Sequence, residues 1–322
     1  MSPAFRVRCH LLLLCVSALR GHSCAAELRE AVDYDPWRVL GASPKREVAG
    51  EEPYHRALRC LDALSLQGQF TFTADQPQLH CAAFLIAEPG ELLTVQADHA
   101  SLDCQRGDFL KVFDGWILKG EKFPSTQDHP LPTPQRYVDL CAGGLSGGGI
   151  TSSQNVAMLF FRVHEPGNGF TVTIRTHPNL FPCNAVSPSP SGRFTLVVPQ
   201  QRRNCSFSVV YPVVVRISDL ALGRFSGLQV KEGPLGCGGT GDFVELLGGV
   251  GLDPSKMMPL ADLCYPFRGP AQMKIGCDSA VVRMVSSGRH TNRMTVEYHQ
   301  LETQDMEAPN ENGLQPACVS GP

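Results

Sequence analysis

The stretch Gly68-Gln69-Phe70-Thr71-Phe72-Thr73 decides the fold, because its aromatic and polar side chains alternate and because its pattern recurs. The order Gly-x-Phe-Thr returns 124 positions later as Gly192-Arg193-Phe194-Thr195. Alternation with a period of two is typical of a β-strand with one buried face. Recurrence at a nearly constant shift indicates that one strand-rich domain occurs twice in the chain.

The cysteines follow the same duplication. Ten of the 13 lie beyond residue 24, as two sets of four and one late pair, and the sets are related by shifts of 123, 124, 133 and 123 residues. They are Cys60, Cys81, Cys104 and Cys141; Cys183, Cys205, Cys237 and Cys264; and Cys277 with Cys318. An even number of widely spaced cysteines predicts disulfides in a secreted protein rather than a zinc site. The simplest scheme pairs first with second and third with fourth in each set, although spacing does not fix connectivity.

Short apolar or alternating runs separated by turn residues fill both halves of the chain. In the first half they are Ala82–Ile86, Leu92–Gln96, Phe109–Phe113, Val156–Val163 and Phe170–Thr176. Gly107-Asp108-Phe109 recurs as Gly241-Asp242-Phe243, and only Tyr54–Leu64 has a weak amphipathic helical pattern. These patterns predict an all-β protein of two tandem, disulfide-stapled antiparallel β-sandwiches.

The two ends of the chain indicate processing and a tethered tail. Residues 1–24 have a basic start at Arg6 and Arg8, an apolar run too short to span a bilayer, and small residues near Cys24, which is typical of a signal peptide. We expect an N-terminal arm over 25–59, either docked on a domain or loose. Domains over 60–177 and 183–300 follow. The last segment, 301–322, is expected to be a tail tethered by Cys277–Cys318.

Composition and motifs argue against several classes of function, among them nucleic-acid binding and catalysis. The formal charge of −3 falls by three to −6 when Arg6, Arg8 and Arg20 are removed with residues 1–24, which disfavours nucleic acid as a partner. No later stretch reaches 18 apolar residues, so we expect no membrane span and a soluble, extracellular protein. The sequence has no His-Glu-x-x-His or Gly-x-Ser-x-Gly motif, and its histidines lack metal-ligand spacing. We therefore predict neither an enzyme, nor a cofactor, nor a metal site.

Asn204-Cys205-Ser206 is the only Asn-x-Ser/Thr sequon in the chain. In a secreted protein we expect Asn204 to carry a glycan and therefore to lie at the surface. The alternative is an unused sequon, because its middle residue is a cysteine.

The segment Gly107–Gly115, the following Cys141, Ser153–Met158 and then Gly169-Phe170 together resemble the CUB domain family. The resemblance implies an antiparallel jelly-roll β-sandwich that binds proteins. Family members that bind calcium use an acid after the third cysteine, which Asp108 matches, and a second acid later. The second position falls near His164 here and near Ser287 in the second copy, so no calcium site is predicted.

The chain also resembles the family of corticotropin-releasing factor-binding proteins over nearly its full length. The segments that carry this resemblance are Ala57–Asp62, Leu64–Ala74, Asp108–Pro124, Phe161–Phe170 and Asp242–Gly249. It implies a secreted glycoprotein that captures corticotropin-releasing factor and urocortin peptides, with ten cysteines paired in sequential order. An Arg and an Asp flanking the first domain cysteine affect ligand binding in this family, and they match Arg56 and Asp62.

Arg56 and Asp62 are therefore the candidate ligand-binding residues. Arg56 could pair with a peptide carboxylate or carbonyl, and Asp62 could take a peptide amine or orient Arg59. The alternative is an ordinary surface ion pair with little effect on binding. Three aromatic residues are candidates either for lining the site or for the core: Trp116, Phe123 and Tyr137. The alternative function on the same fold is a secreted CUB-type adaptor or protease enhancer that binds extracellular proteins.

Overall fold

The computed structural model describes residues 54–118, 120–141, 149–223, 237, 241–264, 270–302 and 318. The chain divides into two compact units, 1–38 and 39–322, and all described residues belong to the second. The predicted signal peptide, the arm up to residue 53 and most of the C-terminal tail lie outside this description. No helix within it is long and apolar enough to cross a membrane.

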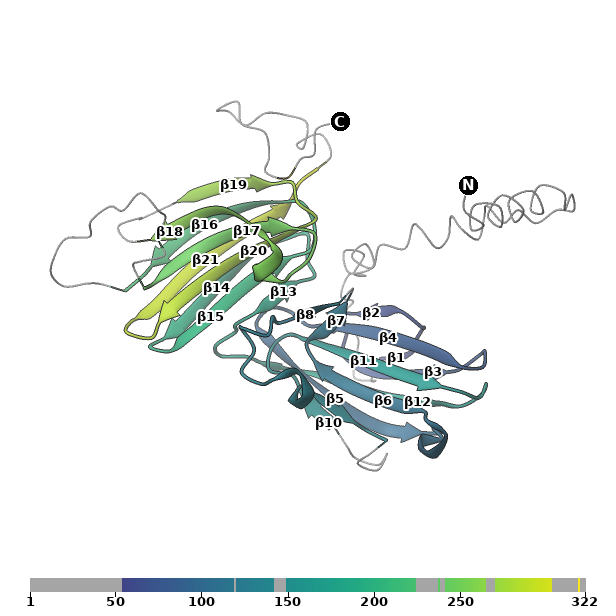
Figure 1. The fold of residues 1–322 in the computed structure, drawn as a ribbon. Coiled ribbons are helices and arrows are strands. Elements are labelled where there is room, and N and C mark those ends of the chain that lie inside the picture. Colours follow the sequence, from purple (N-terminus) through teal and green to yellow (C-terminus); the bar gives the residue numbers. More distant parts are fainter. Residues whose placement is uncertain are drawn as a thin grey trace, which may run out of the picture. The chain divides into compact units, whose positions relative to one another are not determined.

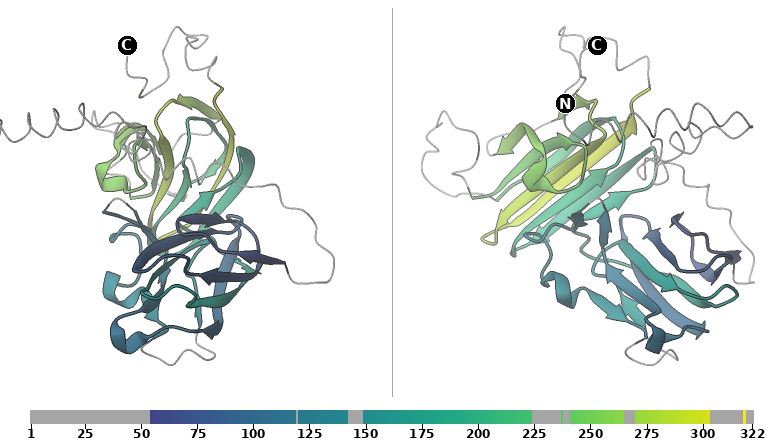
Figure 2. Two further views of the ribbon diagram at one scale, coloured as in Figure 1. Left: turned by 90° about the vertical axis from the view of Figure 1, so that its right-hand side faces the viewer. Right: turned by 45° about the vertical axis from the view of Figure 1, so that its right-hand side comes forward.

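The first sandwich consists of two five-stranded sheets that pack face to face (Figures 1 and 2). One sheet has the order β1 (His55–Ala57), β3 (Gly68–Thr73), β12 (Gly169–Pro178), β5 (Glu91–Ala100) and β10 (Gly149–Thr151). The other has the order β2 (Asp62–Leu64), β4 (Leu79–Ile86), β11 (Val156–Val163), β6 (Phe109–Asp114) and β9 (Tyr137–Asp139). The short strands β1 and β2 pair in parallel with β3 and β4, and the remaining pairs are antiparallel.

Shorter elements complete the first sandwich. A two-stranded ribbon of β7 (Trp116–Leu118) and β8 (Glu121–Phe123) follows β6. The 3-10 turns η1 (Cys104–Arg106) and η2 (Thr133–Gln135) precede β6 and β9. The ribbon packs an indole against the sheet, because Trp116 contacts Phe84 of β4 with ring centroids 6.1 Å apart.

The second sandwich repeats this strand order. Its sheets are β13 (Ala185–Ser187), β15 (Arg202–Val209), β20 (Ser279–Ser287), β17 (Phe243–Gly249) and β18 (Met258–Cys264), and then β14 (Ser191–Pro199), β21 (Thr291–Gln300), β16 (Val213–Ala221) and β19 (Ala271–Ile275). The turn η3 (Pro254–Lys256) precedes β18. Strand by strand, β13-β15-β20-β17-β18 matches β2-β4-β11-β6-β9, and β14-β21-β16-β19 matches β3-β12-β5-β10. Strand β1 has no counterpart in the described part of the second sandwich.

The two copies share details that follow from the internal repeat. The hydroxyls of Thr71 and Thr171 lie 3.0 Å apart across neighbouring strands, and those of Thr195 and Thr295, 124 residues further along, lie 3.0 Å apart as well. Each sandwich also has a β-bulge at the corresponding place, in the pairing of β12 with β5 and of β21 with β16. The predicted fold class, an all-β protein of two disulfide-stapled sandwiches, is confirmed.

Five disulfides join the ten cysteines in sequential order, which is the simplest scheme that the repeat suggests. They are Cys60–Cys81, Cys104–Cys141, Cys183–Cys205, Cys237–Cys264 and Cys277–Cys318. Their sequence separations run from 21 to 41 residues. A bridge that closes a loop of this size stabilises a fold by about 3–4 kcal/mol, chiefly by restricting the unfolded chain.

The core of the first sandwich contains a cluster of three phenylalanine rings from three strands. Phe161 of β11 lies 4.6 Å from the ring centroid of Phe72 and 4.8 Å from that of Phe170. All three side chains are buried. Because successive residues of a strand point to opposite faces, Phe160 lies on the outer side of the same sheet and is 40% exposed.

The weak helical pattern over Tyr54–Leu64 does not form a helix. The segment forms β1 and β2 instead, and it crosses from one sheet to the other between them. Leu58 is buried in the core, and Cys60 is bridged to Cys81 of β4. Pairing with β3 and β4 supplies the backbone hydrogen bonds that a helix would have made internally. Strand β1 also lies within the stretch predicted as an N-terminal arm, so the first sandwich begins before Cys60.

The position of the core can be tested with two neighbouring phenylalanines. We expect Phe161→Ala to lower the free energy of unfolding by about 3–5 kcal/mol, because it leaves a cavity among packed rings. Phe160→Ala should cost less than about 1 kcal/mol, because its side chain keeps much of its contact with water. Denaturant unfolding of the oxidised protein measures both. Similar losses in the two variants would contradict this assignment of faces.

Candidate functional site

The candidate residues Arg56 and Asp62 form an ion pair with each other. Asp62 is 2% exposed, and its two carboxylate oxygens accept hydrogen bonds from Nη2 of Arg56 at 3.1 and 3.0 Å. The same carboxylate accepts the backbone N–H groups of Arg59 at 3.2 Å and of Ala63 at 3.0 Å. These donors occupy the carboxylate, so Asp62 is placed to position its neighbours rather than to reach a ligand.

This ion pair connects the edges of the two sheets. Arg56 belongs to β1 in one sheet, and Asp62 begins β2 in the other. The disulfide Cys60–Cys81 holds the crossing segment between them. The side chain of Arg56 is 26% exposed, and that of Arg59, whose guanidinium lies 3.6 Å from Asp62, is 75% exposed. A ligand could therefore meet the two arginines at this edge. That Arg56 and Asp62 contribute to ligand binding stays a prediction.

The three aromatic candidates divide between core and surface. Trp116 and Phe123 are buried, and their ring centroids lie 5.2 Å apart inside the ribbon of β7 and β8. Tyr137 is exposed at the start of β9, where the ammonium group of Lys111 lies 5.1 Å from its ring centroid. Of the three, only Tyr137 is accessible to a ligand.

Asp108 bonds to protein donors at the place where the CUB resemblance suggests a calcium ligand. Its Oδ1 accepts the backbone N–H of His164 at 2.9 Å and lies 2.5 Å from Nδ1 of the same residue, while its Oδ2 accepts the N–H of Asp103 at 3.0 Å. In the second copy, Asp242 accepts the N–H of Ser287 at 2.6 Å. The described residues contain no group of three or more side chains placed to hold a metal ion.

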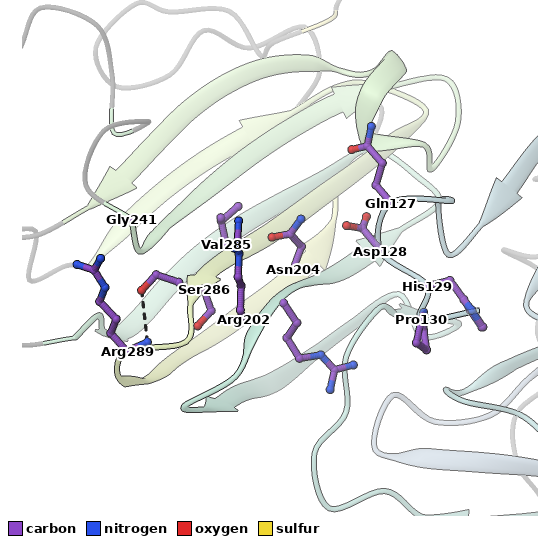
Figure 3. Close-up of a pocket in the computed structure, with 12 residues that line it drawn as sticks. Gln127, Asp128, His129, Pro130, Arg202, Asn204, Gly241, Val285, Ser286 and Arg289 are labelled. Carbon is purple, nitrogen blue, oxygen red and sulfur yellow. Dashed lines mark hydrogen bonds between the residues drawn. The ribbon is translucent and has the colours of Figure 1, made fainter. Parts of the chain in front are cut away.

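A polar cleft of about 930 Å³ lies between the outer face of β15 and β20 and the loop at residues 127–130 (Figure 3). Its lining is drawn from four segments that are far apart in the sequence. The lining residues are Gln127, Asp128, His129, Pro130, Arg202, Arg203, Asn204, Gly241, Val285, Ser286, Ser287 and Arg289. The sequence patterns do not predict this cleft, although three of its residues, Asn204 of the sequon, Gly241 and Ser287, stand at positions that the sequence motifs single out.

A buried arginine shapes the loop that forms one wall of the cleft. Arg136 is fully buried, and its guanidinium donates to the carbonyl oxygens of Leu131 at 3.1 Å, Pro124 at 2.7 Å and Ser125 at 3.2 Å. Burial lowers the pKa of Arg136, and the charge of Asp114 partly counters this effect. Three bonds from one rigid guanidinium fix the path of the loop at both of its ends.

Asp128 anchors this loop to the second sandwich. Its carboxylate accepts from Nη2 of Arg283 at 2.8 Å, and its backbone carbonyl accepts from the side chain of Asn184 at 3.2 Å. Arg283 also donates to Glu245 at 2.7 Å. Burial by itself lowers the pKa of Arg283, but its hydrogen bonds and charge interactions with Asp128 and Glu245 raise the pKa above its ordinary value.

Three other arginines give the cleft its positive charge. Arg202, Arg203 and Arg289 line it, and none of them forms a salt bridge with a described residue. Burial lowers the pKa of Arg203, whose guanidinium makes one long hydrogen bond of 3.5 Å to Gln201. The cleft can therefore donate hydrogen bonds to a ligand that carries oxygen acceptors.

The positioning role of Asp62 can be tested by its effect on stability. We expect Asp62→Ala to lower the free energy of unfolding by about 2–4 kcal/mol, because two backbone N–H groups and Arg56 lose their shared acceptor. Arg59→Ala is the control and should cost less than about 1 kcal/mol, since its side chain is largely solvated. Denaturant unfolding of the oxidised proteins measures both free energies of unfolding. Equal losses in Asp62→Ala and Arg59→Ala would contradict the positioning role of Asp62.

Comparison with known proteins identifies the family. Residues 52–178 match the "Corticotropin-releasing factor binding protein N-terminal domain", and residues 185–307 match the corresponding C-terminal domain. Corticotropin-releasing factor-binding protein of Homo sapiens is 68% identical over 321 residues, covering 100% of both chains, and that of Xenopus laevis is 58% identical over 319 residues, covering 99% of both.

A solved structure, "CUB1-EGF-CUB2 domains of rat MASP-1", is 13% identical and covers 76% of this chain and 100% of its own. Its TM-score of 0.24 is too low to support a conclusion. The full-length identity and the two matched domains are sufficient by themselves: the chain belongs to the corticotropin-releasing factor-binding protein family.

Proposed function

We propose that this protein is a secreted binding protein that captures corticotropin-releasing factor and urocortin peptides and keeps them from their receptors. The observation that carries the proposal is the 68% identity, over the full length of both chains, to the human corticotropin-releasing factor-binding protein. The family is one of hormone-binding proteins by name. Binding alone achieves this function, because a peptide whose receptor-facing side is buried cannot engage a receptor.

The scaffold suits a binding protein that works outside the cell. Five disulfides tie short strands and loops to two sandwich cores, so surface groups keep their positions without a ligand. Preorganisation of this kind raises affinity, because less conformational entropy is lost when the complex forms. Disulfides also persist in oxidising compartments, which agrees with the signal peptide predicted over residues 1–24.

Arg56 is the group through which we expect the first sandwich to contact the peptide. Its Nη2 is held by Asp62, whereas none of the hydrogen bonds to described residues uses its Nη1 or Nε. Those two nitrogens can donate to a carboxylate or carbonyl oxygen of the peptide. Asp62 then acts through Arg56 by fixing its rotamer. An amphipathic helical peptide would bury its apolar face beside this contact.

Binding of labelled corticotropin-releasing factor, measured with and without a calcium chelator, tests the proposed function. We expect saturable binding that the chelator does not weaken, because Asp108 and Asp242 already accept hydrogen bonds from the protein. Urocortin should compete for the same site. Absence of binding would overturn the proposal, and loss of binding on chelation would favour the alternative, a calcium-dependent adaptor of the CUB type.

The contribution of Arg56 can be separated from general damage. We expect Arg56→Ala to weaken peptide affinity by about 1–3 kcal/mol while the protein remains folded. Arg106→Ala is the matched control, since Arg106 is an exposed arginine of the same sandwich that pairs with Asp103 and Glu165. If Asp62 acts through Arg56, the double variant should bind no more weakly than its weaker-binding parent. Unchanged affinity in Arg56→Ala would remove Arg56 from the site.

The role of the disulfides can be tested by reduction. We expect reduced and alkylated protein to lose peptide binding before its circular dichroism shows a large loss of strand. The reason is that the bridges fix the edges and loops, whereas the buried faces of the sheets can still associate. Full affinity after complete alkylation would contradict this expectation.

A further inference from the structure

The sequon at Asn204 is not on an open surface but on the wall of the polar cleft (Figure 3). We propose that the N-linked glycan of Asn204 places its first sugars inside this cleft and braces the loop at residues 127–130 against β15 and β20. The ligand of the cleft is then a carbohydrate that the chain itself carries. This inference rests on the proposed secretion of the protein, since an N-glycan is added only in that pathway.

The direction of the Asn204 side chain is fixed by its strand. The next residue in β15, Cys205, is buried and bridged to Cys183, so its side chain points into the core. Because successive residues alternate, Asn204 points outward, beside its cross-strand partner Val285. Its side chain is partly buried and lines the cleft, and its carboxamide forms no hydrogen bond with any residue that the structure describes.

The walls of the cleft suit sugar rings. Arg202 and Arg289 can donate to hydroxyl and acetamide oxygens, and Gln127 can both donate and accept. Val285 and Pro130 offer apolar surface to the faces of the rings. The volume of about 930 Å³ lies within the range of roughly 300–1,000 Å³ that is usual for small-molecule pockets, so the first sugars fit and the outer branches extend into solvent.

The arginines of the cleft can donate hydrogen bonds to the oxygen atoms of a sugar. Arg202, Arg203 and Arg289 line the cleft without a carboxylate partner among the described residues, and sugar oxygens can accept from them without bringing a charge. The opposite wall is the loop that Asp128 already anchors to Arg283. Sugars that contact both walls would add to this anchor and slow the opening of the loop.

The burial of the sequon also implies when the glycan is attached during folding. Ser206, the third residue of the sequon, is buried, and its hydroxyl donates to Oδ1 of Asn184 at 3.0 Å. The transferase must recognise an accessible Asn-x-Ser segment, so the glycan has to be attached before β15 packs and before Cys205 pairs with Cys183. The sandwich then folds around a sugar that is already in place.

Enzymatic deglycosylation of the native protein tests the location. The protein is expressed in mammalian cells, and peptide N-glycosidase is added to folded and to denatured samples. For the matched control, Arg193→Asn in an Asn204→Gln background creates a sequon with Phe194 and Thr195, at a position in β14 where the side chain is 67% exposed. Both proteins then carry one glycan, one in the cleft and one in solvent.

We expect native deglycosylation at Asn204 to be at least about tenfold slower than in the control, because an opening step costing roughly 1.4 kcal/mol must come first. In denatured samples, the two proteins should be deglycosylated at equal rates.

Hydrogen exchange tests whether the glycan holds the loop. Because the enzyme converts Asn204 to an aspartate that could pair with Arg202, the glycan-free comparison uses Asn204→Gln. In that variant, hydrogen exchange should become faster across residues 124–136. Adding Arg193→Asn to the Asn204→Gln variant should not change hydrogen exchange across residues 124–136 any further.

The possible failures are distinguishable from one another. Equal native rates at the two sites, or unchanged hydrogen exchange across 124–136, overturn the location of the sugars. If the mass of the protein is that of the chain without a glycan, Asn204 is not glycosylated and the proposal fails. Neither result bears on hormone capture, which the binding of labelled peptide measures independently and which fails only if that binding is absent.

Discussion

The disulfide between the first and second cysteine of each copy is the constraint on which the two candidate sites depend. Cys60–Cys81 and Cys183–Cys205 each tie the incoming chain to the second long strand of a sandwich. Directly after each bridge, a three-residue strand pairs in parallel with that strand. Such short strands have little stability by themselves, so the bridge determines where they lie. Asp62, the first residue of β2, is placed in this way, whereas Asn204 stands in the long strand β15, directly before the bridged Cys205.

The two copies use the same bridge for different purposes because the chain that enters them differs. Before Cys60, the chain forms β1 and brings Arg56 to Asp62, which connects the two sheets. Before Cys183, residues 179–182 form the joint between the two sandwiches, directly after β12. There, Oε1 of Gln154 accepts the side chain of Asn179 at 3.1 Å and the backbone N–H of Cys183 at 2.8 Å. The joint takes the place of β1, and the second copy has no counterpart of the Arg56–Asp62 pair in its described part.

The sequence predicts the parts of this molecule that repeat and misses those that do not. Fixed shifts of cysteines and strand motifs predict two sandwiches, because packing requires the same alternation in both. The segment with a weak helical pattern, Tyr54–Leu64, becomes two strands because a bridge and two sheet edges outweigh local preference. The burial of Asp62 depends on a partner in another sheet, which no local pattern reports. The cleft depends on four distant segments, and for the same reason a sequon expected at the surface lies in its wall.

Asp108 and Asp242, the acids that follow the third cysteine of each set, also have a role that the sequence does not predict. In the CUB family this position can serve calcium, and the sequence shows only that a second acid is lacking. The structure shows what the acid does instead. In both copies it accepts a backbone N–H at the end of the adjacent strand of the sheet, from His164 after β11 in one copy and from Ser287 of β20 in the other. The carboxylates of Asp108 and Asp242 thus fasten the ends of neighbouring strands with protein donors, as a bound cation would with protein oxygens, and the rigidity that a binding scaffold needs is built from the chain itself.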